Sequence, residues 1–134
     1  MMVKLPAGKP GKGELLNADC PSREVLKRLT GRWSLLVLIA LKQETLRFSA
    51  LRRRIGGVSE RMLAQTLRHM EEDGFIQRTA YEVVPPHVEY HLTPLGREAE
   101  SRIAVLADWL ENNLGRIMQH RSAAAGETAV GNSE

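Results

Sequence analysis

Two short helical patterns separated by a glycine pair constrain the fold of this chain more than any other feature. They cover residues 48–54 and 59–72, and Gly56-Gly57 lies between them. In the second pattern Leu63 and Leu67 share one side of a helix with about 3.6 residues per turn, while arginines occupy the other side. Two helices with apolar faces, joined by a tight turn, predict a helix-turn-helix unit.

The polar side of the second helix carries side chains that are able to read DNA bases. Arg61, Gln65 and Arg68 gather opposite Leu63. Because arginine pairs with guanine and glutamine with adenine in the major groove, this helix is predicted to be a recognition helix. An ordinary solvated helix face is the alternative reading of the same residues. The residues expected at the major groove are Ser59, Arg61, Met62, Gln65 and Arg68. Ser59 is also expected to cap the start of this helix.

A second group of basic residues is expected to contact DNA phosphates. Arg52, Arg53 and Arg54 follow one another along the first helix, so they cannot all face the core. Arg78 and His87, which lie beyond the recognition helix, are the other candidates. For the arginine run, a solvated face without any DNA contact is the alternative.

The segments after the recognition helix predict a β-hairpin followed by a long helix. Residues 75–81 and 88–92 are strand-like, and Pro85-Pro86 between them cannot donate ladder hydrogen bonds, so the prolines belong at the hairpin tip. Thr93-Pro94 supplies an N-cap and a proline at the first helical position. A hairpin directly after a recognition helix is the wing of a winged helix.

The segments before residue 48 predict two further helices and a short extended piece. One helix begins at Pro21-Ser22, and the next covers residues 32–42, whose nearly continuous apolar character predicts a central position. Residues 46–48 are extended, and Ser49 is expected to cap the third helix. The predicted fold is mainly α (α+β), a winged helix-turn-helix with a two-stranded wing and an added C-terminal dimerisation helix.

Length and charge suggest one domain with a polyanionic partner. The chain has 134 residues, which is typical of a single domain. Its first 58 residues hold 12 Lys and Arg against 4 Asp and Glu, and this basic half favours double-stranded DNA as the partner. The expected organisation is a flexible basic tail over 1–19, the DNA-binding domain over 20–118 and a flexible tail over 119–134. The apolar run 35–41 is too short to span a membrane, so we expect a cytoplasmic protein without membrane contact.

Catalytic and metal chemistry find no support in the residue pattern. The single cysteine excludes an intramolecular disulfide and a cysteine-rich zinc site. The four histidines are scattered without a metal-binding spacing. We therefore expect no enzyme, no metal and no cofactor. The remaining alternative is a winged-helix module that binds protein without specific DNA recognition, because Met62 and Glu72 lie near the exposed helix face.

The ordered set of motifs resembles the HxlR-type transcriptional regulators of bacteria and archaea over residues 20–118. The segments that carry the resemblance are Cys20-Pro21, Gly31-Arg32-Trp33, Arg47-Phe48-Ser49-Ala50-Leu51, Glu71-Glu72-Asp73-Gly74-Phe75-Ile76, Val84-Pro85-Pro86, Val88-Glu89-Tyr90 and Leu92-Thr93-Pro94-Leu95-Gly96. The resemblance implies a homodimeric winged helix-turn-helix protein whose terminal helices form the dimer interface. One departure is His87, which stands where many members carry arginine after the two prolines.

A homodimer is expected through the last helix and the first. The apolar stripe from Leu95 to Ile117 is longer than a small helical core needs to cover. Trp109 is the expected anchor because aromatic side chains concentrate at interface centres; packing into the monomer's own core is its alternative. The residues expected at the interface are Val25, Leu29, Leu106, Trp109 and Leu110.

Cys20 is the candidate for redox sensing. The resemblance implies that some family members respond to oxidants or electrophiles through the cysteine at this position. Cys20 directly precedes a predicted helix, whose N-terminal dipole favours the thiolate. A small buried side chain that packs the start of that helix is the alternative. The operator, the direction of regulation and any small-molecule effector cannot be named from the sequence.

Overall fold

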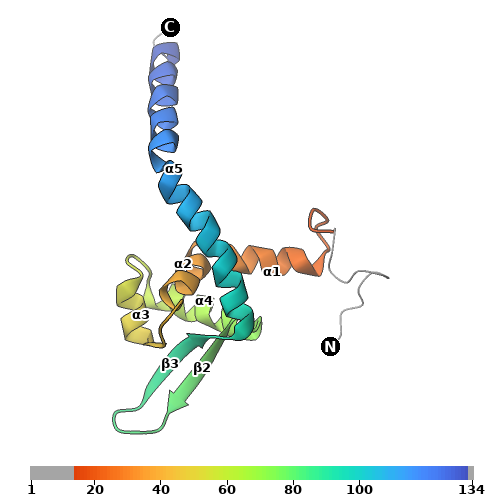
Figure 1. Ribbon diagram of the computed structural model, residues 1–134, viewed down its shortest axis with the longest axis vertical. Coiled ribbons are helices and arrows are strands. Elements are labelled where there is room, and N and C mark those ends of the chain that lie inside the picture. Colours follow the sequence, from red (N-terminus) through yellow and green to blue (C-terminus); the bar gives the residue numbers. More distant parts are fainter. Residues whose placement is uncertain (1–13, 133–134) are drawn as a thin grey trace. The chain divides into compact units, whose positions relative to one another are not determined.

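The computed structural model describes residues 14–132 and has the predicted winged-helix architecture (Figure 1). The elements in chain order are α1 (Pro21–Leu29), α2 (Arg32–Ala40), β1 (Leu46–Arg47), α3 (Phe48–Arg54), α4 (Glu60–Glu72), β2 (Ile76–Tyr81), β3 (His87–Leu92) and α5 (Pro94–Asn132). The chain divides into two compact units, Met1–Glu100 and Ser101–Glu134, so α5 begins in the first unit and forms the second.

The core of the first unit is built from α2, α3, α4 and the wing strands. Val37 and Leu38 on α2 are fully buried, as the apolar character of this helix predicted. The buried side of α4 consists of Leu63, Thr66, Leu67 and Met70. Packing one face of α4 into this core leaves its opposite face in solvent.

The sheet has three antiparallel strands in the order β1-β3-β2. The hairpin register pairs Ile76 with Leu92 at the base and Tyr81 with His87 near the tip, with Pro85-Pro86 in the connecting turn. β1 is the extended piece predicted before the third helix, and it pairs with β3. The expected two-stranded wing is therefore joined by a short third strand.

Both ends of α4 have defined hydrogen-bonded caps. Ser59 Oγ accepts the Met62 N–H at 3.1 Å, which confirms the predicted N-cap. After the helix, Gly74 has a φ of 87°, and the Phe75 N–H donates to the Met70 carbonyl at 2.9 Å. With the Gly74 N–H donating to Glu71, this is a Schellman motif, which requires the left-handed conformation that glycine adopts without strain.

The start of α5 is fastened to the end of α4. The Gly96 N–H donates to Thr93 Oγ at 3.0 Å, so Thr93 caps α5 as predicted. Gly96 lies against the main chain of Phe75, which follows the Schellman turn. A Cβ atom on residue 96 would lie 1.9 Å from the Phe75 carbonyl oxygen. The first turn of α5 therefore has a defined place in the first unit.

Three boundary predictions differ from the structure or lie outside it. The helix α5 continues through Asn132, so the segment 119–132 is helical where a flexible tail was expected. The N-cap of α3 is Arg47, not Ser49, because the chain passes directly from β1 into the helix. Of the expected N-terminal tail, residues 1–13 lie outside the described residues, and the turns before Cys20 cover the rest.

Candidate nucleic-acid interface

The exposed face of α4 has the composition that the sequence predicted. Arg61, Gln65 and Arg68 are all exposed, whereas Leu63 and Leu67 on the opposite face are buried. Ser59 and Met62 are also exposed at the start of the helix. The Ser59 oxygen accepts the capping bond, so its hydroxyl hydrogen remains able to donate to an external acceptor.

The three consecutive arginines of α3 are all exposed but differ in their partners. Arg52 turns toward the start of α4: its Nε donates to the Val58 carbonyl at 3.4 Å, and its Nη1 lies 3.6 Å from a Glu60 carboxylate oxygen. Arg54 forms an ion pair with Glu44 on the preceding loop. Within the described part of the chain, Arg53 forms no ion pair, so its charge is the most available of the three.

An open hollow of about 630 Å³ lies between α3 and the start of α4. It brings Arg52 and Arg53 to the same surface as Ser59, the N-cap of α4. Its lining residues are Phe48, Ser49, Arg52, Arg53, Gly57, Val58, Ser59 and Glu60. The sequence predicted Arg52 and Arg53 as phosphate contacts and Ser59 as a helix cap, without relating them to one another. The fold places all three on one surface.

In the wing, His87 and Arg78 have different surroundings. The His87 ring stacks on Tyr81 with a centroid separation of 4.8 Å, and its Nε2 lies 3.2 Å from a Glu89 carboxylate oxygen. Arg78 is exposed on β2, opposite Tyr90 in the register. Because His87 is engaged within the hairpin, Arg78 is the stronger wing candidate for a phosphate contact. In the turn between the two strands, Val84 is 99% exposed.

Cys20 is the N-cap residue of α1 and is 7% exposed. Its N–H donates to the Asn17 carbonyl at 3.1 Å, and its carbonyl accepts the Arg23 N–H at 2.9 Å. The Arg23 guanidinium donates to the Leu16 carbonyl at 3.0 Å. The thiol thus lies buried at the point where the preceding turn enters α1.

The residues expected at a dimer interface are accessible in the single chain. Val25 on α1 is exposed, and Leu29 is half-buried. On the α5 part of the second unit, Trp109 is 55% exposed. The large exposed apolar side chains among residues 101–126 are Val105, Leu106, Trp109, Leu110, Leu114 and Met118.

Neither a metal-binding cluster nor a membrane-spanning helix occurs among the described residues. Within residues 14–132 no three or more His, Cys, Asp or Glu side chains are grouped so that they could hold a metal ion. In the same part of the chain no helix combines the length and apolar character needed to cross a membrane.

Comparison with known proteins identifies the family. The chain is 57% identical over 114 residues to the HTH-type transcriptional regulator YtfH of Escherichia coli, covering 85% of this chain and 90% of that protein. The solved structure of the transcriptional regulator ytfH from Salmonella typhimurium is similar, with 56% identity, a TM-score of 0.77 and coverage of 81% and 96%. The redox regulator HypR in its reduced form has 32% identity and a TM-score of 0.68, with coverage of 74% and 98%. Residues 28–118 match the HxlR-like helix-turn-helix family, and the chain therefore belongs to this family of transcriptional regulators.

Proposed function

We propose that this protein is a sequence-specific DNA-binding regulator that acts as a homodimer on a two-fold symmetric operator. The observation that carries this proposal is the exposed α4 face with Arg61, Gln65 and Arg68, on a helix whose other side is buried and whose ends are both capped. A helix held in this way presents base-reading side chains in a fixed orientation, which lowers the entropy lost on binding.

In this proposal α4 enters the major groove and the surrounding cations position it. Arg61, Gln65 and Arg68 read base edges, and Arg53 with Arg78 neutralises phosphates. The Ser59 hydroxyl, which shares a surface with Arg53, donates to a phosphate at the start of α4. Arg52 and Arg54 contribute less, because each already faces a carboxylate of this chain.

Dimerisation through α1 and α5 is supported by the exposed apolar residues of these helices. A helix with the side chains of Leu106, Trp109 and Leu110 in water gains free energy when they are covered. A second copy of the chain offers the same apolar stripe, as a two-fold interface requires. Two copies of α4 would then meet successive major grooves about 34–36 Å apart.

A response to oxidants or electrophiles through Cys20 is supported by its position and by one relative. The similar protein HypR is described as a redox regulator and has been solved in oxidized and reduced forms. Cys20 is buried where the chain enters α1, so an adduct on its sulfur would displace the start of that helix. Because the chain has no second cysteine, an intersubunit bond would join two Cys20 sulfurs, with an added oxidant such as diamide accepting the two hydrogens.

The first experiment is to select an operator from a random duplex pool and to titrate it against the purified protein at several salt concentrations. Binding to the selected site should fall steeply with salt, because phosphate neutralisation releases counterions. Failure to enrich any sequence, together with a flat salt dependence, would instead favour a protein-binding winged helix. Comparing wild type with Cys20→Ser before and after diamide then tests the redox part, which fails if both proteins respond alike.

A further inference from the structure

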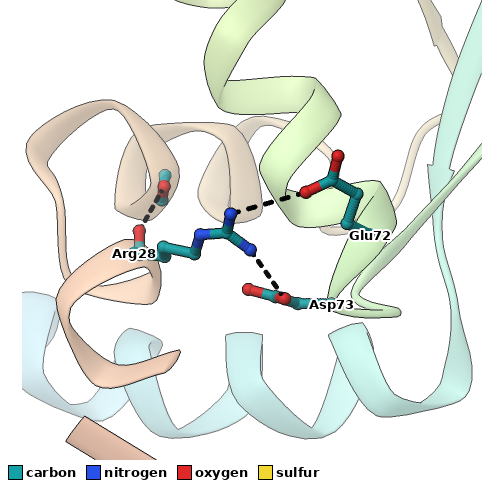
Figure 2. Close-up of polar contacts among 4 residues, drawn as sticks. Arg28, Glu72 and Asp73 are labelled. Carbon is teal, nitrogen blue, oxygen red and sulfur yellow. Dashed lines mark hydrogen bonds and ion pairs between the residues drawn. The ribbon is translucent and has the colours of Figure 1, made fainter. Parts of the chain in front are cut away.

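One side chain of α1 reaches the far end of the recognition helix. Arg28 Nη1 lies 3.0 Å from Asp73 Oδ1, and its Nη2 lies 3.4 Å from Glu72 Oε1 (Figure 2). Asp73 is the C-cap residue of α4, and Glu72 is the last residue of that helix. A single guanidinium therefore contacts both residues that end the helix proposed to read DNA.

The main chain of Arg28 is fixed as well. The buried Ser34 hydroxyl of α2 donates to the Arg28 carbonyl at 2.7 Å. The Gly31 N–H donates to the same carbonyl at 3.4 Å. Because the base of the side chain is held against α2, the contact with Asp73 joins three helices at one point.

Of the two ion pairs of Arg28, the one with Asp73 is stronger than the one with Glu72. The Asp73 side chain is 17% exposed and that of Arg28 is 29% exposed, whereas Glu72 is 53% exposed. Partial burial reduces screening by solvent, so the Asp73 pair is worth more than an exposed ion pair. A cation at a helix C-terminus also interacts favourably with the helix dipole.

The side chains of α1 stay partly in solvent where this helix packs beside α4. No residue within α1 is buried, so an extensive apolar interface does not hold this helix in place. At the ends of α1 and α4, Arg28 supplies two hydrogen-bonded ion pairs across the helix boundary, to Asp73 and to Glu72. Because apolar packing restrains α1 only weakly, the directional ion pair between Arg28 and Asp73 defines the orientation of α1 relative to α4.

We infer that Arg28 is a positioning residue for DNA recognition, an inference that rests on the proposed function. By holding Asp73 against α1 and α2, it sets the angle at which the exposed α4 face meets the groove. A shift of α1 is thereby passed to α4 through the guanidinium. Arg28 touches no DNA in this scheme; it acts on recognition only through the helix that it holds.

Arg28 could also affect DNA binding only through its charge. The two explanations predict opposite changes in DNA affinity for Asp73→Asn. Glu71, Glu72 and Asp73 form an acidic run that repels DNA, and Arg28 offsets part of it. If charge alone matters, Asp73→Asn removes a negative charge and should tighten binding to every duplex. If positioning matters, the same change should weaken binding to the selected operator, since Asn cannot form the ion pair.

The test compares Arg28→Met, Asp73→Asn and the double variant in the full-length protein. Methionine keeps an unbranched apolar stem, and asparagine keeps the shape of aspartate. Glu44→Gln serves as the matched control for a lost carboxylate that pairs with an arginine, and Arg97→Met serves as the control for a lost exposed arginine. Each protein is titrated with the selected operator and with random duplex DNA of equal length at one salt concentration.

We expect the ratio of operator affinity to random affinity to fall about fivefold for each single variant, the scale of one ion pair. The ratio should fall no further in the double variant, because both single changes already break the same Arg28–Asp73 ion pair. Amide hydrogen exchange at Gly74 and Phe75, whose N–H groups close the Schellman motif, should accelerate in the same variants. Neither control should change the ratio.

Unchanged ratios in Arg28→Met and Asp73→Asn, with only a lower melting temperature, would overturn the inference, because Arg28 would then only stabilise the fold. Tighter binding of Asp73→Asn to both duplexes would also overturn it in favour of charge. If Arg28→Met does not fold, Arg28→Lys replaces it and should retain part of the ratio. If wild type shows no preference for any duplex, the proposed function fails, while the exchange rates still decide whether Arg28 holds the end of α4.

Discussion

The Thr93 hydroxyl donates a hydrogen bond to the Gly74 carbonyl at 2.6 Å, which joins the residue that caps α5 to the glycine that ends α4. The same oxygen accepts the Gly96 N–H, so one side chain serves both helices. The Thr93 N–H also donates to the Phe75 carbonyl at 3.1 Å. The base of the wing is thereby closed by hydrogen bonds that run directly to the end of the recognition helix.

Arg68→Ala should weaken binding to the selected operator far more than binding to random DNA. Losing a bidentate base contact costs about 1–3 kcal/mol at the specific site. Random duplex offers no fixed partner base, so its affinity should change little. Fluorescence anisotropy with both duplexes measures the difference. An equal loss on both duplexes would assign Arg68 to a phosphate.

Arg53→Ala should reduce the slope of log affinity against log salt by about one unit, because one phosphate contact is lost. Arg54→Ala should change the slope less, since the Glu44 carboxylate already pairs with that guanidinium. Arg97→Ala, which removes an exposed arginine of α5, is the control for net charge. Identical slopes for Arg53→Ala and Arg97→Ala would support a solvated face for the arginine run of α3.

Gly96→Ala should destabilise the protein, although alanine favours helices. The added Cβ would lie 1.9 Å from the Phe75 carbonyl oxygen, so the start of α5 must move away from the end of α4. Overpacking of this kind costs about 1–3 kcal/mol or more in the free energy of unfolding.

Gly115→Ala is the matched control for Gly96→Ala, because its new Cβ meets no atom within 4 Å. Within a helix this change should stabilise by roughly 0.5–1 kcal/mol. Urea unfolding followed by circular dichroism compares both variants with wild type. Equal stability of the two variants would contradict a close contact at Gly96.

Trp109→Ala should weaken self-association, because an exposed tryptophan among apolar neighbours has the character of an interface hot spot. Such residues contribute about 2 kcal/mol or more, which corresponds to roughly thirtyfold in the dimer dissociation constant. Glu111→Ala, an exposed change on the same helix, should have a much smaller effect. Sedimentation equilibrium measures both. A wild-type monomer at micromolar concentration would contradict the proposed dimer itself.

Local chemistry was sufficient to predict the elements that present the candidate site. Ser59 and Thr93-Pro94 are helix-start signals that act within one turn, and Gly74 supplies the left-handed conformation that ends α4. The four-residue spacing of Leu63 and Leu67 predicted which side of α4 is buried, and therefore that Arg61 and Arg68 on the other side lie in solvent. These predictions succeeded because caps and periodicity depend on neighbours along the chain.

Some local signals were misread. The small residues after position 119 resembled a tail, yet they continue α5, because alanine and similar residues are compatible with a helix. Ser49 is a favourable capping residue, but pairing of Leu46-Arg47 with β3 makes the chain enter α3 at Phe48. In the second case a long-range strand pairing overrode a local preference.

What the sequence by itself determined was the order of elements, the capped recognition helix and the identity of its exposed side chains. The tertiary structure alone decided which charges remain available. Arg28 meets Asp73 across 45 residues, Arg54 meets Glu44, and His87 meets Glu89 and Tyr81 within the wing. An ion pair forms only where two side chains lie close together in space. The packing of α1, α3 and the hairpin determines these distances, and local sequence periodicity contains no information about them.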